Sequence, residues 1–295
     1  MENNQLAVRG LWLPLITPFL DGRLDEASLR RLVRHYCAEP IDGLILCATT
    51  GEGLTLSDVE AERLVSVCAA ELASEQSALP LYLGLSGSDT RRLVETLERT
   101  APWPVGGYLI ACPYYTRPTQ HGLYQHFSAL ADSTPRPILI YNIPYRTGVN
   151  LGNETMLRLA ERENIIGVKD CSADPAQSFD LMRRRPSDFV VLTGEDTFFY
   201  TALAHGAEGG IMASAHVETS AFANIRNSLL KGDQEGALSD WNILAALPPL
   251  LFAEPSPAPI KYWLWRVGLI DSPEVRLPMV PVSEELARRI DQEIA

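Results

Sequence analysis

Lys169 is the residue of this sequence best suited to covalent chemistry. It ends the apolar run Ile165-Ile166-Gly167-Val168-Lys169, and only Lys231 and Lys261 join it as lysines among the 25 lysine and arginine residues. An ammonium ion buried in a strand costs several kcal/mol unless it is paired or loses its proton, which lysine can do and arginine cannot. A neutral amine in an apolar pocket attacks a carbonyl carbon and forms a Schiff base. The alternative is a strand-end lysine that extends its ammonium group to solvent.

Schiff-base chemistry needs proton donors, proton acceptors and a substrate anchor around the amine. Loss of water from the carbinolamine requires a nearby hydroxyl, and Tyr141 is the candidate proton shuttle. Arg146 follows in the next loop and can bind a carboxylate with two hydrogen bonds. Thr49-Thr50-Gly51 offers hydroxyl and backbone N–H groups to a second carboxylate, such as that of pyruvate. Taken singly, the same residues also fit a packed tyrosine, a surface arginine and an ordinary turn.

Apolar, β-rich runs alternate with helix-period segments eight times along the chain. Such strands indicate a parallel sheet buried on both faces, and eight units predict a closed (β/α)8 TIM barrel with a C-terminal helical appendage. A doubly wound open sheet is the alternative, but no G-x-G-x-x-G follows the first run. The eight runs are residues 11–19, 43–50, 79–85, 107–115, 137–143, 165–170, 189–193 and 209–215.

Polar residues at helix starts mark where the intervening helices begin. Asp25 and Asn153 are predicted to be N-caps, and Ser57 with Glu60 has the spacing of a capping box. A helix is also expected to start near Ser88 or Asp89, and another after Thr119.

The chain is predicted to divide into a catalytic barrel and a helical region packed on it. Residues 1–218 form the barrel in this interpretation, and residues 219–295 form the C-terminal helical region. Three helices are expected there, near residues 219–231, 234–251 and 257–268.

The candidate residues lie where the predicted strands end, and the active site of a TIM barrel lies at the carboxyl ends of its strands. Lys169 therefore shares one mouth with two threonines and up to three tyrosines. The polar strand ends are Thr49 to Glu52, Tyr114-Tyr115, Tyr141-Asn142, Lys169, Thr193 to Asp196, and Ser214 with His216.

Composition limits the classes of partner. The net charge of −12 argues against nucleic acid and anionic membrane surfaces. No apolar run approaches the ~18 residues of a membrane span, and the first five residues lack the pattern of a signal peptide. The five cysteines lack C-x-x-C spacing and are expected to be reduced thiols in the cytoplasm. The five histidines are scattered without ligand spacing, so no metal is predicted.

Taken together, these motifs resemble the dihydrodipicolinate synthase and N-acetylneuraminate lyase family of pyruvate-dependent class I aldolases. The resemblance spans nearly the whole chain, in the order and at the spacing of the family. The matching segments are Thr49-Thr50-Gly51-Glu52, Pro113 to Pro118, Gly122 to Phe127, Tyr141 to Gly148, Gly167-Val168-Lys169-Asp170, Glu254-Pro255-Ser256-Pro257 and Arg276-Leu277-Pro278-Met279.

The resemblance implies a role for each candidate residue, with no cofactor beyond the covalent Schiff base to pyruvate or another 2-keto acid. Lys169 matches the Schiff-base lysine and Tyr141 the proton-relay tyrosine. Tyr115 matches a tyrosine that reaches into a neighbouring subunit, which implies a homo-oligomer, usually a dimer of dimers. The remaining matches are Thr49 in the relay, Thr50 at the pyruvate carboxylate, Arg146 at the second carboxylate, and Gly194 and Ile211 near the bound substrate.

Arginine at position 146 resembles the synthase branch, which condenses pyruvate with aspartate semialdehyde in lysine biosynthesis. Ala48, Gly53-Leu54, Cys171 and Met212-Ala213 depart from the synthase pattern, and several are expected near the second-substrate pocket. An aldolase or dehydratase for a 2-keto-3-deoxy sugar acid, or a lyase for a sialic-acid-like substrate, is therefore the alternative. A catalytically lapsed barrel that acts as a binding protein is a third possibility, which the combined retention of the site residues disfavours.

We predict that free lysine does not inhibit this protein. Some bacterial synthases of the family bind lysine at a feedback site, where asparagine and glutamate are typical at the positions of Ser88 and Arg92. Arginine in place of glutamate repels the ammonium group of lysine. Calorimetric titration with lysine is expected to give no binding heat, and micromolar to low-millimolar binding would contradict the prediction.

Overall fold

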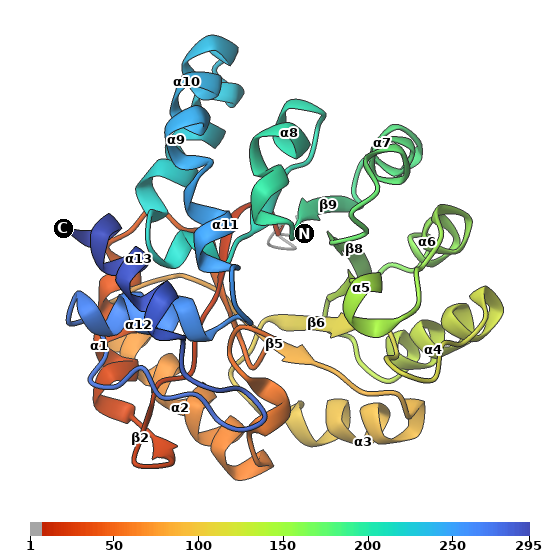
Figure 1. Cartoon of the computed structure of the whole chain (residues 1–295). Coiled ribbons are helices and arrows are strands. Elements are labelled where there is room, and N and C mark those ends of the chain that lie inside the picture. The colour runs from red at the N-terminus through yellow and green to blue at the C-terminus, as the bar shows by residue number, and fades with distance from the viewer. Residues whose placement is uncertain (1–7) are drawn as a thin grey trace.

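Eight parallel strands close into a barrel in the computed structural model, which describes residues 8–295 (Figure 1). The strands follow one another around the barrel in the order β1-β10-β9-β8-β7-β6-β5-β4, and each pairs in parallel with its neighbours. The predicted TIM barrel is confirmed. The strands are β1 (Gly10–Pro14), β4 (Gly43–Leu46), β5 (Leu81–Leu85), β6 (Gly107–Ala111), β7 (Ile138–Asn142), β8 (Ile165–Asp170), β9 (Val190–Thr193) and β10 (Gly209–Ile211). A short antiparallel pair, β2 (Phe19–Leu20) and β3 (Arg23–Leu24), follows β1.

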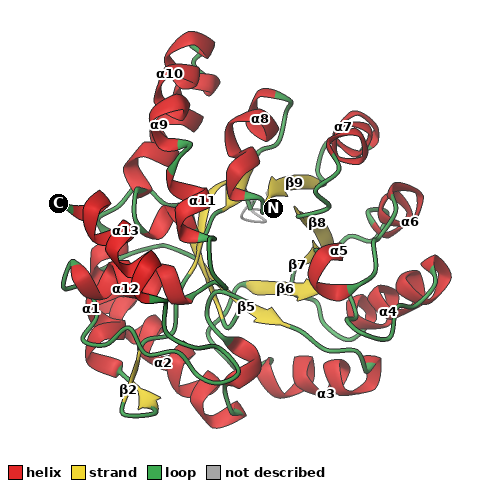
Figure 2. Cartoon of the chain, in the orientation of Figure 1, coloured by secondary structure: helices red, strands yellow, loops and turns green. Residues whose placement is uncertain are grey.

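Helices surround the barrel, as the view along its axis shows (Figure 2). The longer helices connect successive strands, and three short 3-10 turns, η1 (Gly53–Thr55), η2 (Asp196–Phe198) and η3 (Ser214–His216), follow β4, β9 and β10. The helices up to the last strand are α1 (Glu26–Cys37), α2 (Asp58–Ser74), α3 (Thr90–Thr100), α4 (Gln120–Asp132), α5 (Pro144–Thr147), α6 (Asn153–Leu159), α7 (Pro175–Arg184) and α8 (Phe199–Ala204).

Most predicted helix starts are confirmed. Asp25 caps α1, Asp89 caps α3, and Ser57 with Glu60 forms a complete capping box on α2. The prediction for Asn153 is wrong, because Gly152 is the N-cap of α6. The side-chain amide of Asn153 instead donates to the carboxylate of Asp180 on α7, at 2.9 Å. A tertiary contact has therefore replaced the local capping bond that its position suggested.

Several predicted strands are too long. The run 43–50 leaves the β conformation after Leu46, and Cys47 has a φ of 58°. The run 107–115 ends at Ala111, four residues before Tyr115, whose φ is 68°. In both places the residues with candidate functions belong to loops above the barrel. The prediction extended the strands into these loops because the neighbouring residues are apolar.

The C-terminal region adds five helices beside the barrel: α9 (Thr219–Leu230), α10 (Gln234–Leu244), α11 (Leu247–Leu251), α12 (Ala258–Arg266) and α13 (Glu284–Ile294) (Figure 1). Two predictions need correction here. The expected helix over 234–251 is interrupted at Ala245, and the second piece begins anew with Pro248 in its first turn. Helix α13 was missed, although Ser283 caps it and Leu286 and Ile290 are buried one turn apart.

The interior of the barrel below the mouth is apolar. Trp12 and Tyr82 meet edge to face with their ring centroids 5.0 Å apart, and Gly43 leaves room for the indole, because a Cβ there would lie 2.4 Å from it. The inner cluster also contains Ile45, Leu109, Leu139, Leu192 and Ile211. This packed floor closes the barrel and leaves the mouth as the place where polar side chains gather.

Candidate active site

Lys169 lies inside the mouth of the barrel, on β8. The register of β7 and β8 places Tyr141 directly opposite it. Lys169 is only 5% exposed, and its Nζ atom lies 4.4 Å from the centroid of the Tyr141 ring. Lys169 forms no salt bridge with any other residue of the described range 8–295. The amine is therefore buried without a partner charge, which is the environment that favours loss of its proton.

The pKa of Lys169 is lowered, and burial is the largest cause. Cys171, Asp196 and Glu195 act in the opposite direction, whereas the positive charge of Arg146 lowers the pKa further. Burial in turn raises the pKa of both carboxyl groups, Glu195 and Asp196. The net shift is toward the neutral amine, which is the form that attacks a carbonyl carbon.

Tyr141 keeps its proton under all ordinary conditions. It is buried on β7, and burial raises the pKa of its phenol well above the usual value. A neutral phenol can donate one hydrogen bond and accept another, which is what a proton relay beside a Schiff base requires.

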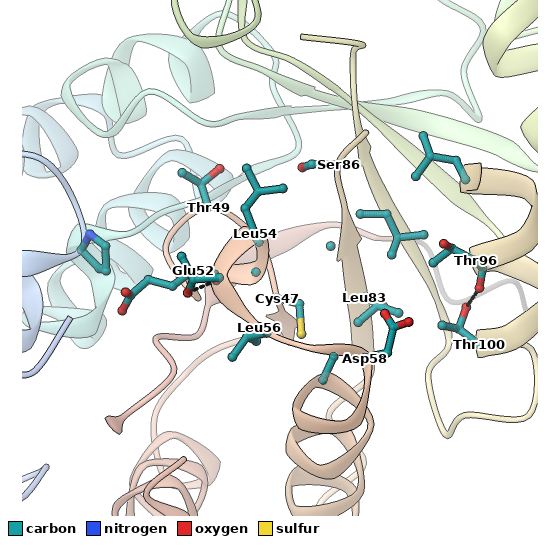
Figure 3. A pocket seen from close by; sticks show the side chains of 18 of the residues that line it. Cys47, Thr49, Glu52, Leu54, Leu56, Asp58, Leu83, Ser86, Thr96 and Thr100 are labelled. Atoms are coloured by element: carbon teal, nitrogen blue, oxygen red, sulfur yellow. Dashed lines mark hydrogen bonds between the residues drawn. The ribbon is translucent and has the colours of Figure 1, made fainter. Parts of the chain in front are cut away.

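The loop after β4 carries the two threonines. Thr50 is buried, whereas Thr49 is exposed and lines a pocket of about 370 Å³ together with Ser86 (Figure 3). Arg146 also lines this pocket. The pocket continues from the mouth toward the space between α2 and α3, and Lys169 and Tyr141 are not part of its lining.

Arg146 lies on α5, directly after β7, and its side chain is exposed. The preceding strand end is firmly held, because the Asn142 carboxamide oxygen accepts a hydrogen bond from the Leu151 backbone at 3.0 Å. The guanidinium lies 5.8 Å from the centroid of the Tyr145 ring. The structure therefore brings Arg146 to the rim of the mouth, with its guanidinium group exposed.

Gly194 and Ile211 complete the lining around the lysine. A Cβ at Gly194 would lie 2.4 Å from both Cε of Lys169 and Sγ of Cys171, so only glycine leaves room for the lysine side chain. Ile211 is fully buried on β10, opposite Trp12 of β1.

Tyr115 is not brought to Lys169 within the chain. It is 91% exposed and adopts a left-handed conformation, with a φ of 68°. Its backbone N–H donates to the carbonyl of Thr147 at 3.1 Å, which ties this loop to the loop of Arg146. A large aromatic side chain held in solvent by a strained backbone is unusual for a residue without a partner.

His216, at the end of the last predicted strand, has a structural role. Its Nε2 accepts a hydrogen bond from the Ile16 backbone at 3.2 Å, and its Nδ1 lies 2.8 Å from the Ala213 carbonyl. Both ring nitrogens are engaged by the backbone, so the imidazole is not available to a substrate.

The sequence analysis gave no role to two buried residues beside the site, Glu52 and Lys261. Glu52, directly after the threonines, forms a fully buried salt bridge with Lys261 of α12. The signal for Lys261 was present, since it is another of the three lysines in an arginine-rich chain. Its partner could not be read from the sequence, because the two residues are 209 positions apart.

Two features of residues 8–295 concern metals and membranes. The His, Cys, Asp and Glu side chains of this range do not gather in groups of three or more that could hold a metal ion. Every helix of the same range is too short or too polar to cross a bilayer.

Comparison with known proteins agrees with this geometry. A family model described as the dihydrodipicolinate synthetase family matches residues 7–295. The 4-hydroxy-tetrahydrodipicolinate synthase 2 of Clostridium acetobutylicum is 44% identical over 287 residues, which cover 97% of this chain and 99% of that protein. The 4-hydroxy-tetrahydrodipicolinate synthase of Methylobacterium radiotolerans is 38% identical and covers 96% of this chain, with 94% of its own length matched. The crystal structure of dihydrodipicolinate synthase from Aquifex aeolicus superposes with a TM-score of 0.92 at 31% identity, covering 97% of each chain.

We predict that Lys169→Met stabilises the protein by about 0.5–2 kcal/mol at pH 7. Because the pKa of Lys169 is lower in the folded than in the unfolded chain, its burial costs stability below the folded-state pKa. That cost fades as the pH rises toward the ordinary lysine pKa of about 10.4. Urea unfolding of both proteins between pH 6 and about 10 measures the difference.

Lys231→Met is the matched control, because Lys231 is exposed at the end of α9. We expect it to change the free energy of unfolding by less than about 0.5 kcal/mol at every pH. Equal gains for the two variants, or a gain for Lys169→Met that grows with pH, would contradict the burial of an unpaired amine.

Proposed function

The chain belongs to the dihydrodipicolinate synthetase family, and we propose that it condenses pyruvate with aspartate semialdehyde through a Schiff base on Lys169. The 44% and 38% identical relatives are both 4-hydroxy-tetrahydrodipicolinate synthases, and the match extends over nearly the full length of each. The observation that carries the proposal is the unpaired, buried Lys169 opposite Tyr141.

The reaction begins with attack of the neutral Lys169 amine on the keto carbon of pyruvate. The carbinolamine loses its hydroxyl as water, and the protons move through the hydroxyl groups of Tyr141 and Thr49. Loss of a proton from the methyl carbon then gives an enamine. That carbon attacks the aldehyde carbon of aspartate semialdehyde, a carbon–carbon bond forms, and the aldehyde oxygen takes up a proton. No metal or organic cofactor is required for these steps.

The two carboxylates are assigned to two different loops. Thr50, buried at the end of the β4 loop, would hold the pyruvate carboxylate with its hydroxyl and backbone N–H. Arg146, exposed at the rim, would hold the carboxylate of the second substrate. Gly194 leaves room for the substrate-bearing lysine, and Ile211 forms part of the apolar floor.

The exposed Tyr115 supports assembly as a homo-oligomer. Its strained backbone and 91% exposure fit a side chain that packs against a neighbouring copy of the chain. We propose a dimer of dimers in the cytoplasm, in which Tyr115 of one copy joins the proton relay of the next.

A sugar-acid aldolase is the second candidate. Met212 was one of the differences from the synthase pattern that favoured it, and its position in the structure removes this support. Met212 is buried and belongs to the outer core between barrel and helices, whereas its neighbour Ile211 belongs to the inner cluster. Its difference from the usual synthase residue therefore does not reach the substrate.

Sodium borohydride is expected to reduce the pyruvate Schiff base and leave a stable adduct on Lys169. Wild-type protein treated with pyruvate and borohydride should show the added mass on the peptide that contains Lys169. Lys169→Met gives no adduct, and protein treated without pyruvate is the control. Absence of the wild-type adduct would sink the proposed mechanism.

Arg146→Ala is expected to lower kcat/KM for aspartate semialdehyde about 10–100-fold, the effect of one charge-assisted carboxylate interaction. Pyruvate trapping by borohydride should be almost unchanged, because Arg146 is assigned to the second substrate. Arg288→Ala, on the exposed face of α13, should have neither effect. Faster turnover of a 2-keto-3-deoxy sugar acid than of aspartate semialdehyde by the wild type would favour the second candidate.

A further inference from the structure

Lys261 is the most deeply buried charged residue of the described chain. It lies on α12, is 0% exposed, and forms a salt bridge with the carboxylate of Glu52. Its Nζ also donates to the carbonyl oxygen of Glu274 at 2.7 Å and lies 4.2 Å from the centroid of the Phe19 ring. The ammonium thus faces a carboxylate, a carbonyl and an aromatic face, three surfaces that carry partial or full negative charge.

Glu52 connects this buried cation to the loop that carries Thr49 and Thr50. It follows Thr50 by two residues and adopts the left-handed conformation, with a φ of 52°. Its backbone N–H donates to the carbonyl of Thr49 at 3.1 Å, closing the turn. Its second carboxylate oxygen accepts the backbone N–H of Arg276 at 2.9 Å. Figure 3 shows the Glu52 side chain extending away from Thr49, toward the blue C-terminal segment.

Other hydrogen bonds also hold this loop, but the Glu52 carboxylate provides its buried ionic contact. Thr17 donates its hydroxyl to the carbonyl of Gly51 at 2.6 Å, and the N–H of Gly53 donates to Ala48 at 3.2 Å. The first bond joins the loop to the segment that follows β1, and the second lies within the loop. Two groups join the loop to the C-terminal region: the Glu52 carboxylate, directly after the threonines, and the Thr55 carbonyl, which accepts a hydrogen bond from the Arg276 guanidinium at 3.0 Å. A non-glycine residue held at a positive φ persists when its surroundings fix it in place.

Lysine suits position 261 better than the arginine used almost everywhere else in this chain. The enclosed space offers acceptors in different directions, which the compact ammonium with its three donors can meet, whereas the planar fork of a guanidinium cannot. Burial lowers the pKa of Lys261 to about 8, so the amine is still largely protonated at neutral pH. The pair therefore works as a fixed charge contact and not as a second nucleophile.

We propose that Lys261 is a positioning residue for pyruvate, which acts through Glu52 to hold Thr49 and Thr50 in the conformation that receives the substrate carboxylate. The inference rests on the proposed function, since it takes pyruvate as the ligand of that loop. It makes α12 and the segment around Glu274–Arg276 part of the active-site framework, although they lie outside the barrel.

The test is a pyruvate titration of the borohydride-trapped adduct on Lys169 in wild type, Lys261→Met and the double variant Glu52→Gln/Lys261→Met. The single variant leaves a buried carboxylate unpaired and can lose stability. The double variant removes both charges and keeps the packing volume, so it is expected to fold. For the double variant we expect the pyruvate concentration at half-maximal trapping, and KM for pyruvate, to rise at least about tenfold (~1.4 kcal/mol). KM for aspartate semialdehyde should change less than about threefold.

Arg185→Met/Glu208→Gln is the matched control. This salt bridge is also largely buried, but Glu208 directly precedes β10 and so lies at the amino ends of the strands, away from the mouth. We expect it to lower the thermal midpoint without changing the pyruvate titration.

The outcomes separate the two proposals. If the wild type forms no adduct, the proposed function fails and this inference with it. If the wild type forms the adduct and the double variant titrates like the control, the function stands and the role of Lys261 is overturned. A parallel rise in KM for both substrates would also overturn it, because it would indicate general distortion of the barrel mouth.

Discussion

The central constraint of this structure is the burial of one amine without a countercharge. Closure of eight parallel strands points alternate side chains inward, and the register between β7 and β8 sets Lys169 opposite Tyr141 above an apolar floor. Gly194 supplies the space that the lysine occupies. Because water and paired carboxylates are kept from the amine, its pKa falls, and the same desolvation holds the phenol of Tyr141 neutral. One packing arrangement thus prepares both the nucleophile and the proton relay.

The two buried lysines show how the surroundings decide what one residue type does. Lys169 has an aromatic ring and no salt bridge, whereas Lys261 has a carboxylate, a carbonyl and an aromatic ring around its ammonium. The first arrangement favours the neutral amine and the second favours the charged one, although both side chains are removed from solvent. An arginine could serve at neither position, because it does not lose its proton and does not fit three acceptors in different directions.

The barrel, and the position of Lys169 and Tyr141 at its mouth, could be predicted because their signals are local. Apolar runs at regular spacing indicate parallel strands, and polar residues at strand ends indicate the mouth. Predictions failed where a distant contact decided the outcome. Asn153 bonds to Asp180 instead of capping its own helix, and Glu52 finds its cation 209 residues away. Strand ends were overestimated for a related reason, since Tyr115 lies among apolar neighbours but adopts a left-handed turn that only the folded loop requires.

Departures from the family pattern matter according to the direction in which each side chain points. Met212 faces the outer core, so its identity does not touch the reacting atoms. Cys171 belongs to the inner cluster and lies beside Lys169 and Tyr141. Of the residues that differ from the synthase pattern, it is therefore one that can change the shape of the substrate pocket. Burial raises the pKa of its thiol well above the usual value, so it remains neutral at physiological pH. It therefore adds volume next to the lysine, and the thiolate that would raise the pKa of Lys169 is not the form present at physiological pH.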